Sequence, residues 1–252
     1  MAPVISGHTR GPALTVAIGS WAIAITIGIL FAGQPHASPV DRWFSAWVHS
    51  VFGDRGRLAT VLLVPTDTSV IAAALVVIVV VALVRHRGDV ALLAAITPVI
   101  GVGLVELAFK PLFDRRLHGY LSYPSGHAVA SMAVYTVALL ALASTGGPLR
   151  RWLAATGWVL LTVIVLIGLV AMDCHYPTDA VGGVFVAIGV TVPCFLGTDR
   201  MLCRAPAIRI PVQRPGSANE PLCAAVGGHQ SSVDSGRPGP DFRRRGRHRQ
   251  RA

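Results

Sequence analysis

Charged residues are scarce in this chain: only 13% of its 252 residues are Asp, Glu, Lys or Arg, whereas 53% are hydrophobic. An ordinary soluble domain has about 25% charged residues, so this shortage argues against a soluble globular protein. The formal net charge of +10 lies mostly in one segment, since residues 199–252 hold 11 Arg and only 4 acidic residues. Because these basic residues are separated from the apolar body, nucleic acid is not an expected partner.

Cysteine is also rare, and its spacing does not match a set of metal ligands. Disulfide scaffolds normally serve small secreted domains rather than chains with this much apolar sequence. We therefore expect no metal site, and we expect thiols rather than disulfides at the four cysteines, Cys174, Cys194, Cys203 and Cys223.

Long apolar runs dominate the remainder. Six of them have about 19 residues or more, enough to cross a hydrocarbon core of roughly 30 Å as helices. Lipid offers no hydrogen-bond partners to the backbone, so a helix is the favoured structure for each run. The sequence therefore predicts an all-α bundle of six transmembrane helices. The runs lie near Pro12–Gly33, Leu58–Val84, Val90–Phe109, His127–Thr145, Trp152–Met172 and Ala180–Thr198.

The basic residues near the helix ends predict the orientation. With the N-terminus inside, 16 basic residues fall on the cytoplasmic side and 6 on the other, although the tail contributes most of this contrast. We expect a multi-pass protein of the plasma (inner) membrane with both termini cytoplasmic. A cleaved signal peptide is the alternative for the first run, which is longer than a typical signal core.

Two segments flank or follow the spans. Between spans one and two, aromatic residues such as Trp43, Phe44 and Trp47 recur at helical spacing, which predicts either an interfacial helix or an ordinary aromatic belt. We divide the chain into a six-span domain, residues 1–198, and a basic cytoplasmic tail, residues 199–252, which we expect to be disordered. The tail either contacts anionic lipid head groups or only fixes the topology.

Ionisable residues inside an apolar span indicate function by default, because they are costly there. Asp67 lies within the second span, where it either has a function or caps a solvated kink after Pro65. Glu106 and Lys110 are four residues apart near the end of the third span, in the favourable order for a helical ion pair.

The densest cluster of polar residues runs from Lys110 to His127. Ser125 is a plausible N-cap of the fourth span, and His127 would fall in its first turn. A helix N-terminus presents backbone N–H groups to an anion, and Gly126 lets the anion approach closely. These features describe a phosphate cradle, although a Ser-Gly pair before a helix is by itself a weak signal.

A second cluster, residues 173–179, joins the fifth and sixth spans. Pro177 is expected to start the sixth helix, which leaves His175 in the loop and puts Asp179 in the first turn. A carboxylate that binds one imidazole nitrogen leaves the other available as a nucleophile. If the six spans alternate, this loop and the Lys110–His127 segment open on the same membrane face and can converge.

Together these motifs resemble the type 2 phosphatidic acid phosphatase family of integral membrane lipid phosphatases. Pro124-Ser125-Gly126-His127 matches the family's second motif completely, and His175 with Asp179 matches part of the third. The Ser-Arg pair of the third motif would fall on Gly168 and Leu169, so one phosphate-binding guanidinium is absent from its usual place.

The first motif also departs from the family pattern, because its Arg-Pro would fall on Leu117 and His118. Arg115 and Arg116 lie within one or two positions of that place. Our hypothesis is that both reach the phosphate and compensate for the missing guanidinium.

The resemblance implies phosphoryl transfer without a metal or another cofactor. His175 would attack phosphorus to form a phosphohistidine, Asp179 would stabilise the resulting imidazolium, and His127 would act as acid and then base. The phosphate oxygens would be neutralised by Lys110, Arg115, Arg116, Ser125 and Gly126.

The expected substrate is a lipid phosphate, either a polyprenyl pyrophosphate or a phosphatidate-like lipid, presented on the outer face of the membrane. Sequence does not choose between these lipids, and it does not predict an oligomeric state. Two alternatives remain: a catalytically impaired membrane protein that binds lipid phosphate, and a phosphotransferase that uses an acceptor lipid instead of water. A transporter is disfavoured, because inverted-repeat and half-helix signals are not apparent.

Overall fold

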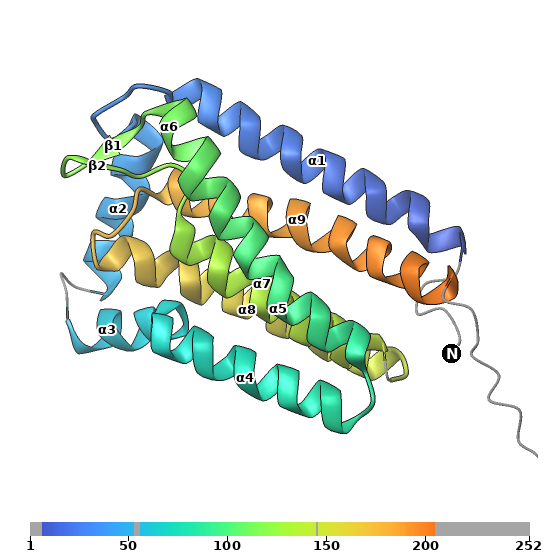
Figure 1. Cartoon of the computed structure of the whole chain (residues 1–252). Helices are drawn as coiled ribbons and strands as arrows, with labels where there is room; N and C mark the ends of the chain where they lie inside the picture. Colours follow the sequence, from blue (N-terminus) through green and yellow to red (C-terminus); the bar gives the residue numbers. More distant parts are fainter. Residues whose placement is uncertain (1–6, 53–55, 145, 205–252) are drawn as a thin grey trace, which may run out of the picture. The chain divides into compact units, whose positions relative to one another are not determined.

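The computed structural model describes residues 7–52, 56–144 and 146–204, which form a helical bundle with one short hairpin (Figure 1). The predictions for the tail beyond residue 204 lie outside the described residues. In chain order the elements are α1 (Gly7–Phe31), α2 (Pro39–Phe52), α3 (Arg57–Leu63), η1 (Val64–Thr66), α4 (Thr68–Val84), α5 (Gly88–Leu104), η2 (Val105–Phe109), α6 (Lys110–Phe113), β1 (Arg116–Leu117), β2 (Tyr120–Leu121), α7 (Gly126–Ser144), α8 (Pro148–Ala171) and α9 (Pro177–Arg204).

Within the described residues, five helical segments are long and apolar enough to cross a membrane: Arg10–Phe31, Gly88–Phe113, Gly126–Ser144, Pro148–Ala171 and Pro177–Thr198. The segment Arg57–Thr66 and the helix α4 pass the same test together, but they meet at a bend of 42°. The predicted all-helical architecture is therefore confirmed. The number of spans is five, or six if the bent pair is one span.

Local chemistry explains this bend. Pro65 lies in the short helix η1 and has no backbone N–H to continue the helical hydrogen bonds. Asp67 then starts α4 as its N-cap, and its Oδ1 accepts a hydrogen bond from the Ser69 backbone N–H at 2.8 Å. The hydroxyl of Tyr135 in α7 donates to the Pro65 carbonyl at 2.7 Å. The capping interpretation of Asp67 is therefore confirmed.

The outer faces of the helices are apolar. On α4, for example, Val76, Val77, Val80 and Val81 are all exposed. Exposed apolar surface on this scale is unfavourable in water and suited to hydrocarbon. Together with the spans, it indicates an integral membrane protein.

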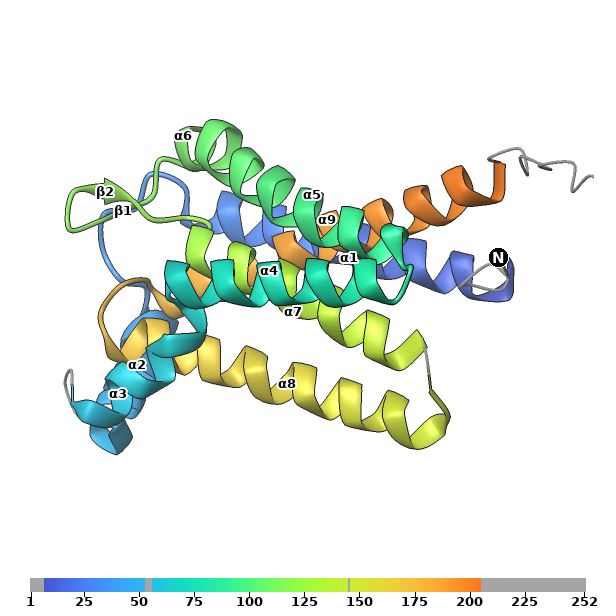
Figure 2. The same cartoon turned by 60° about the horizontal axis from the view of Figure 1, so that its bottom comes forward.

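Helix α9 is central to the bundle, since it packs against α1, α5 and α7 (Figure 2). Its glycines allow the close approach. A Cβ at Gly183 would lie 2.7 Å from the Ser125 carbonyl oxygen, and one at Gly189 would lie 2.8 Å from the Trp21 ring. Trp21 also donates a hydrogen bond to the Gly189 carbonyl at 2.9 Å. The start of α9 is therefore held directly against the start of α7.

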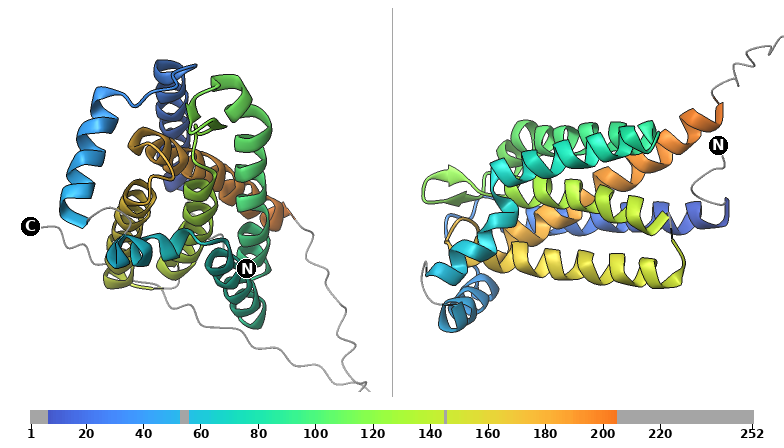
Figure 3. Two further views of the ribbon diagram at one scale, coloured as in Figure 1. Left: turned by 90° about the vertical axis from the view of Figure 1, so that its left-hand side faces the viewer. Right: turned by 90° about the horizontal axis from the view of Figure 1, so that it is seen from below.

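The elements that carry the predicted site residues lie at one end of the bundle (Figure 3). This end holds α2, α6, the β1–β2 hairpin, the start of α7 and the loop between α8 and α9 (Figure 1). The first turns of α1, the end of α9, and the α4–α5 and α7–α8 connections lie at the opposite end. The structure thus brings the segment after α5 and the loop after α8 to the same end.

Helix α2 lies within the region where the sequence predicts an interfacial helix. Its Trp43 and Trp47 side chains are exposed, whereas Val48 is buried and packs in a cluster with Ala59 and Val170. The helix is therefore attached to α3 and α8 by one face. Its position at a membrane surface remains a proposal.

Candidate active site

The Pro-Ser-Gly-His turn begins α7 and is fixed from both sides. The Ser125 hydroxyl accepts a hydrogen bond from the Ala128 backbone N–H at 3.3 Å, so Ser125 is the N-cap that the sequence predicts. The Ser125 backbone N–H donates to the Asp179 carbonyl at 3.0 Å. His127 lies in the first turn, as expected, and its side chain is exposed. The turn therefore presents His127 outward while α9 holds its backbone.

Two histidines face each other at this end. His175 lies in the loop before α9, which starts at Pro177 as predicted. The ring centroids of His127 and His175 are 6.0 Å apart, and Tyr120 packs edge-on against His175 at 6.5 Å. A separation of this size lets one phosphate group contact both imidazoles.

The environment of His175 keeps its imidazole neutral. Burial, followed by the positive charges of His127 and Lys110, lowers the pKa of His175 to about 3. A neutral imidazole has a lone pair available for attack on phosphorus at any physiological pH.

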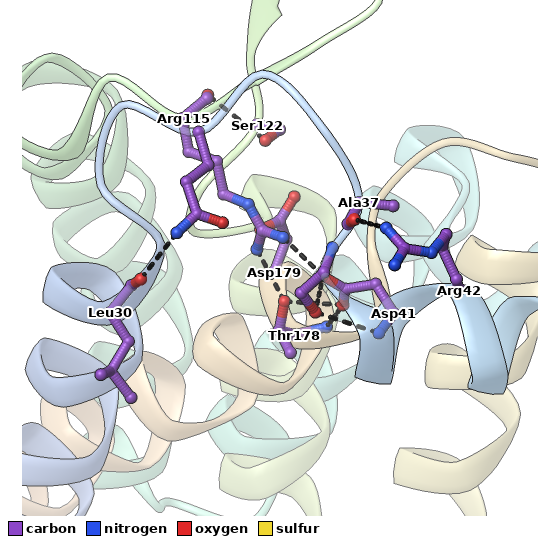
Figure 4. Close-up of polar contacts among 10 residues, drawn as sticks. Leu30, Ala37, Asp41, Arg42, Arg115, Ser122, Thr178 and Asp179 are labelled. Atoms are coloured by element: carbon purple, nitrogen blue, oxygen red, sulfur yellow. Dashed lines mark hydrogen bonds and ion pairs between the residues drawn. The ribbon is translucent and has the colours of Figure 1, made fainter.

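Arg115 occupies an unexpected position. Its guanidinium is fully buried and bridges two buried carboxylates, with Nη2 2.6 Å from Asp41 Oδ2 and Nη1 2.5 Å from Asp179 Oδ1 (Figure 4). Nη1 also donates to the Thr178 hydroxyl at 2.6 Å. The rings of Phe31 and Tyr176 lie 4.7 and 4.6 Å from the guanidinium carbon. We call Asp41, Arg115, Thr178 and Asp179 the buried clamp.

The clamp ties α2 to the start of α9. Asp41 Oδ1 accepts hydrogen bonds from the Thr178 backbone N–H at 3.0 Å and from the Thr178 hydroxyl at 2.8 Å. Burial raises the pKa of Asp41, but hydrogen bonds from Ser38 and Thr178, together with the Arg115 charge, hold it below its ordinary value. Asp41 is thus an ionised partner of Arg115.

This geometry differs from the role expected for Arg115. A guanidinium without exposed surface, enclosed by two carboxylates and two aromatic rings, has no face left for a phosphate. The expected contact of Asp179 with His175 is also not observed as a hydrogen bond, since Asp179 Oδ1 binds Arg115. Asp179 Oδ2 and His175 Nδ1 are both buried without a hydrogen-bond partner in the described part of the chain.

The other expected phosphate ligands also have acidic partners. Lys110 Nζ lies 2.6 Å from Glu106 Oε1, which confirms the predicted helical ion pair. A Cβ at Gly126 would lie 3.0 Å from the same Glu106 oxygen, so this pair adjoins the turn before α7. Arg116 is about half exposed and pairs with Asp114 at 2.9 Å. Lys110 therefore lies at the site, whereas Arg116 points to an exposed turn.

A pocket of about 380 Å³ adjoins His175. It contains a basic residue that the sequence did not single out, Arg42 of α2, and the hairpin residue His118. The sequence feature that could have identified Arg42 as a candidate site residue is its position beside Asp41 on the amphipathic helix α2. The pocket is lined by Ala37, Arg42, Ser45, Leu117, His118, Asp173, His175 and Tyr176.

Within the residues that the structure describes, no three His, Cys, Asp or Glu side chains gather as a candidate metal cluster. The arrangement that is present consists of a buried neutral imidazole, an exposed imidazole, a lysine and a helix N-terminus. These groups suit the binding and transfer of a phosphoryl group. The fold and the site together describe a helical membrane protein with two facing histidines at one end of the bundle.

Comparison with known families gives the same assignment. Residues 106–201 match the family model described as the PAP2 superfamily, which agrees with the resemblance of the sequence motifs to the type 2 phosphatidic acid phosphatases. The match begins in η2, ends in α9 and contains every predicted site residue. Searches of curated proteins and of solved structures found no match. Members of this family are phosphatases, which supports a phosphoester hydrolase.

Proposed function

We propose that the chain is a membrane lipid phosphatase that hydrolyses a phosphomonoester or pyrophosphate of a lipid through a phosphohistidine at His175. The observation that carries this proposal is the pair of imidazoles, one buried and neutral, the other exposed, with ring centroids 6.0 Å apart. No metal takes part in the proposed reaction. The substrate is a polyprenyl pyrophosphate or a phosphatidate-like lipid.

In the first step, a lone pair of His175 forms a bond to phosphorus while the bond from phosphorus to the leaving oxygen breaks. His127 gives its proton to that oxygen and releases the lipid product. In the second step, His127 takes a proton from water as the water oxygen attacks the phosphohistidine. The bond between phosphorus and nitrogen breaks, which releases inorganic phosphate and restores both imidazoles.

Asp179 has two tasks in this proposal. Its backbone carbonyl holds the Ser125 N–H, and its carboxylate binds Arg115, so it joins the two turns of the site. Asp179 Oδ2 and His175 Nδ1 are the complementary acceptor and donor that lack partners. We propose that they meet when His175 becomes positively charged, since an unpaired buried imidazolium would be costly.

Three groups carry the negative charge of the phosphate in this scheme. Lys110 pairs with Glu106 beside Gly126, and Gly126, which is only partly buried, begins α7 after the buried Ser125. The Ser125 hydroxyl is engaged as the N-cap but retains donor capacity, because it accepts the bond from Ala128. The proposal assigns no phosphate contact to Arg115 or Arg116.

We further propose that the site faces the outer side of the plasma (inner) membrane and that both termini are cytoplasmic. In support, the first turns of α1 and the end of α9 lie at the end of the bundle opposite the site (Figure 1). A six-span count and an interfacial position of α2 complete this topology. A lipid phosphate at the head-group level can then enter the site without leaving the bilayer.

Phosphate release in detergent tests this function. Purified protein is assayed with a short polyprenyl pyrophosphate and with phosphatidate, in the presence of EDTA. We expect activity on at least one lipid, and we expect His175→Asn to abolish it. The matched control is His86→Asn at the α4–α5 turn, where φ is 54° and Asn is well tolerated. Wild-type activity that survives His175→Asn would remove His175 from the nucleophile role.

The same assay separates the alternatives. A phosphotransferase would release little inorganic phosphate until an acceptor lipid is added. An impaired binding protein would retain lipid phosphate without turnover. The ion pair between Lys110 and Glu106 is the observation that favours this second alternative, because it partly neutralises a cation expected to bind the phosphate.

A further inference from the structure

The cations at this end of the bundle differ in their partners. Arg115 is enclosed by Asp41 and Asp179, Lys110 pairs with Glu106, and Arg116 pairs with Asp114. A cation that already has a carboxylate partner gains less from a phosphate, because the phosphate must compete with that carboxylate. The three cations expected to bind phosphate are therefore all partly or fully neutralised.

Arg42 is different. The only side-chain hydrogen bond of Arg42 among the described residues runs from Nη1 to the Ala37 carbonyl at 2.7 Å (Figure 4). No carboxylate of the described residues forms an ion pair with it. Its side chain is exposed, and a guanidinium has five N–H donors, so most of its donors remain available.

Arg42 also shares a pocket with the nucleophile. The pocket of about 380 Å³ is lined by Arg42 and Ser45 of α2, by His118 of the hairpin turn, and by His175. The Oδ1 atom of its one acidic residue, Asp173, lies 3.2 Å from His49 Nε2. The volume is large enough to admit a phosphate group.

The buried clamp explains why Arg42 is held there. Asp41, its neighbour in sequence, is fixed to Arg115 and Thr178 by contacts of 2.6 to 3.0 Å. The start of α2 is therefore attached to the start of α9, and the two helix starts cannot separate without breaking buried ion pairs. A guanidinium that is pre-positioned in this way loses little entropy when it binds an anion.

We propose that Arg42, assisted by His118, binds oxygens of the phosphate group that His175 attacks. This inference rests on the proposed function and adds a specific ligand to it. The guanidinium donates two parallel N–H bonds to two phosphate oxygens, the geometry in which Arg binds phosphate best. Lys110 and the start of α7 supply the remaining phosphate contacts of the proposed site.

The test is a charge-removal series on one face of the protein. Arg42→Gln removes the guanidinium, and Arg42→Lys restores the charge without the two-pronged geometry. Arg57→Gln at the start of α3 is the matched control, because Arg57 is an exposed arginine at the same end and outside the pocket. Since Arg42 is exposed, the melting temperature of each variant should equal that of the wild type.

We expect Arg42→Gln to raise both KM for the lipid phosphate and the inhibition constant of orthovanadate by about 10- to 100-fold, the range for loss of hydrogen bonds to a charged group. Arg42→Lys should recover part of this loss, and Arg57→Gln should behave like wild type. Unchanged KM and unchanged vanadate inhibition in Arg42→Gln would overturn the inference, as would an effect limited to lipid pyrophosphates.

A binding measurement separates this inference from the proposed function. Calorimetric titration of the full chain with inorganic phosphate requires no turnover. If the wild type hydrolyses no lipid phosphate but binds phosphate in an Arg42-dependent way, the proposed function fails and the Arg42 site stands. If phosphate binds equally to wild type and Arg42→Gln, the Arg42 site is refuted whatever the activity.

Discussion

The position of Arg115 predicts an effect on stability rather than a selective effect on catalysis. Arg115→Ala leaves Asp41 and Asp179 as two buried carboxylates without their cation. Removing one partner of a buried ion pair typically costs about 3–5 kcal/mol. For a chain of this size, about 1 kcal/mol corresponds to roughly 2–4 °C, so the melting temperature in detergent should fall by about 6–20 °C.

The assay is thermal unfolding without any substrate. Arg116→Ala is the control, since Arg116 forms an exposed pair with Asp114, and exposed pairs contribute about 1 kcal/mol or less. A second variant, Arg115→Ala combined with Asp41→Asn, should recover part of the lost stability by removing one buried charge. If Arg115→Ala melts like wild type and only raises KM, Arg115 binds substrate and the clamp has been misinterpreted.

Three further predictions follow from the contacts of the site. Gly183→Ala should lower kcat/KM and destabilise the protein by about 1–3 kcal/mol, because the new Cβ would lie 2.7 Å from the Ser125 carbonyl oxygen. Gly197→Ala is the control, since open space surrounds Gly197, and this variant should be as stable as the wild type or slightly more stable. The free energy of unfolding should fall as the pH drops from 6.5 towards 3, because burial lowers the pKa of His175 to about 3 in the folded protein, so the unfolded chain binds a proton that the folded protein does not. His175→Asn should remove this part of the pH dependence. Tyr135→Phe should destabilise the protein by about 1 kcal/mol in a denaturation assay, because it leaves the Pro65 carbonyl at the α3–α4 break without its hydrogen bond. Tyr120→Phe is the comparison, because the Tyr120 hydroxyl makes its hydrogen bond, to the Cys174 carbonyl, at an exposed position. An unaltered Gly183→Ala enzyme, a pH profile identical in wild type and His175→Asn, or a Tyr135→Phe protein as stable as wild type would each contradict the corresponding contact.

The helices were predictable because their signal is local. Uninterrupted apolar runs such as residues 152–172 admit one structure in lipid, and α8 covers Pro148–Ala171. The break in the second span was also visible, since Pro65 and Asp67 carry the helix stop and the new cap in adjacent positions. The sequence could not predict that the bend is 42°, or that Tyr135 of a different helix donates a hydrogen bond to the Pro65 carbonyl at this break.

The site was predictable in part for the same reason. Ser125 as an N-cap and Pro177 as a helix start follow from residues next to each other, and the facing of His127 and His175 follows from the alternation of spans. The buried clamp does not follow from any of these. Asp41 and Arg115 are 74 residues apart, and nothing near either residue indicates the other.

The clamp also shows what motif spacing could not predict about Arg115, namely its two buried carboxylate partners. Arg115 lies near the position where the family has a phosphate-binding arginine, and for this reason we expected Arg115 to bind the phosphate. Whether an arginine binds substrate depends on the carboxylates around it, and these come from α2 and α9 rather than from its own segment. The unpaired Arg42 became visible only once the partners of the other cations were known.

The central claim is that His175 becomes phosphorylated during turnover. The most direct measurement is rapid acid-free quenching of the enzyme with a terminally ³²P-labelled lipid phosphate, followed by identification of the labelled residue in peptides. The account predicts a label that is stable in alkali, labile in acid, located on His175, and absent from His175→Asn. A label on another residue, or full turnover by a wild-type enzyme that never carries label, would contradict it.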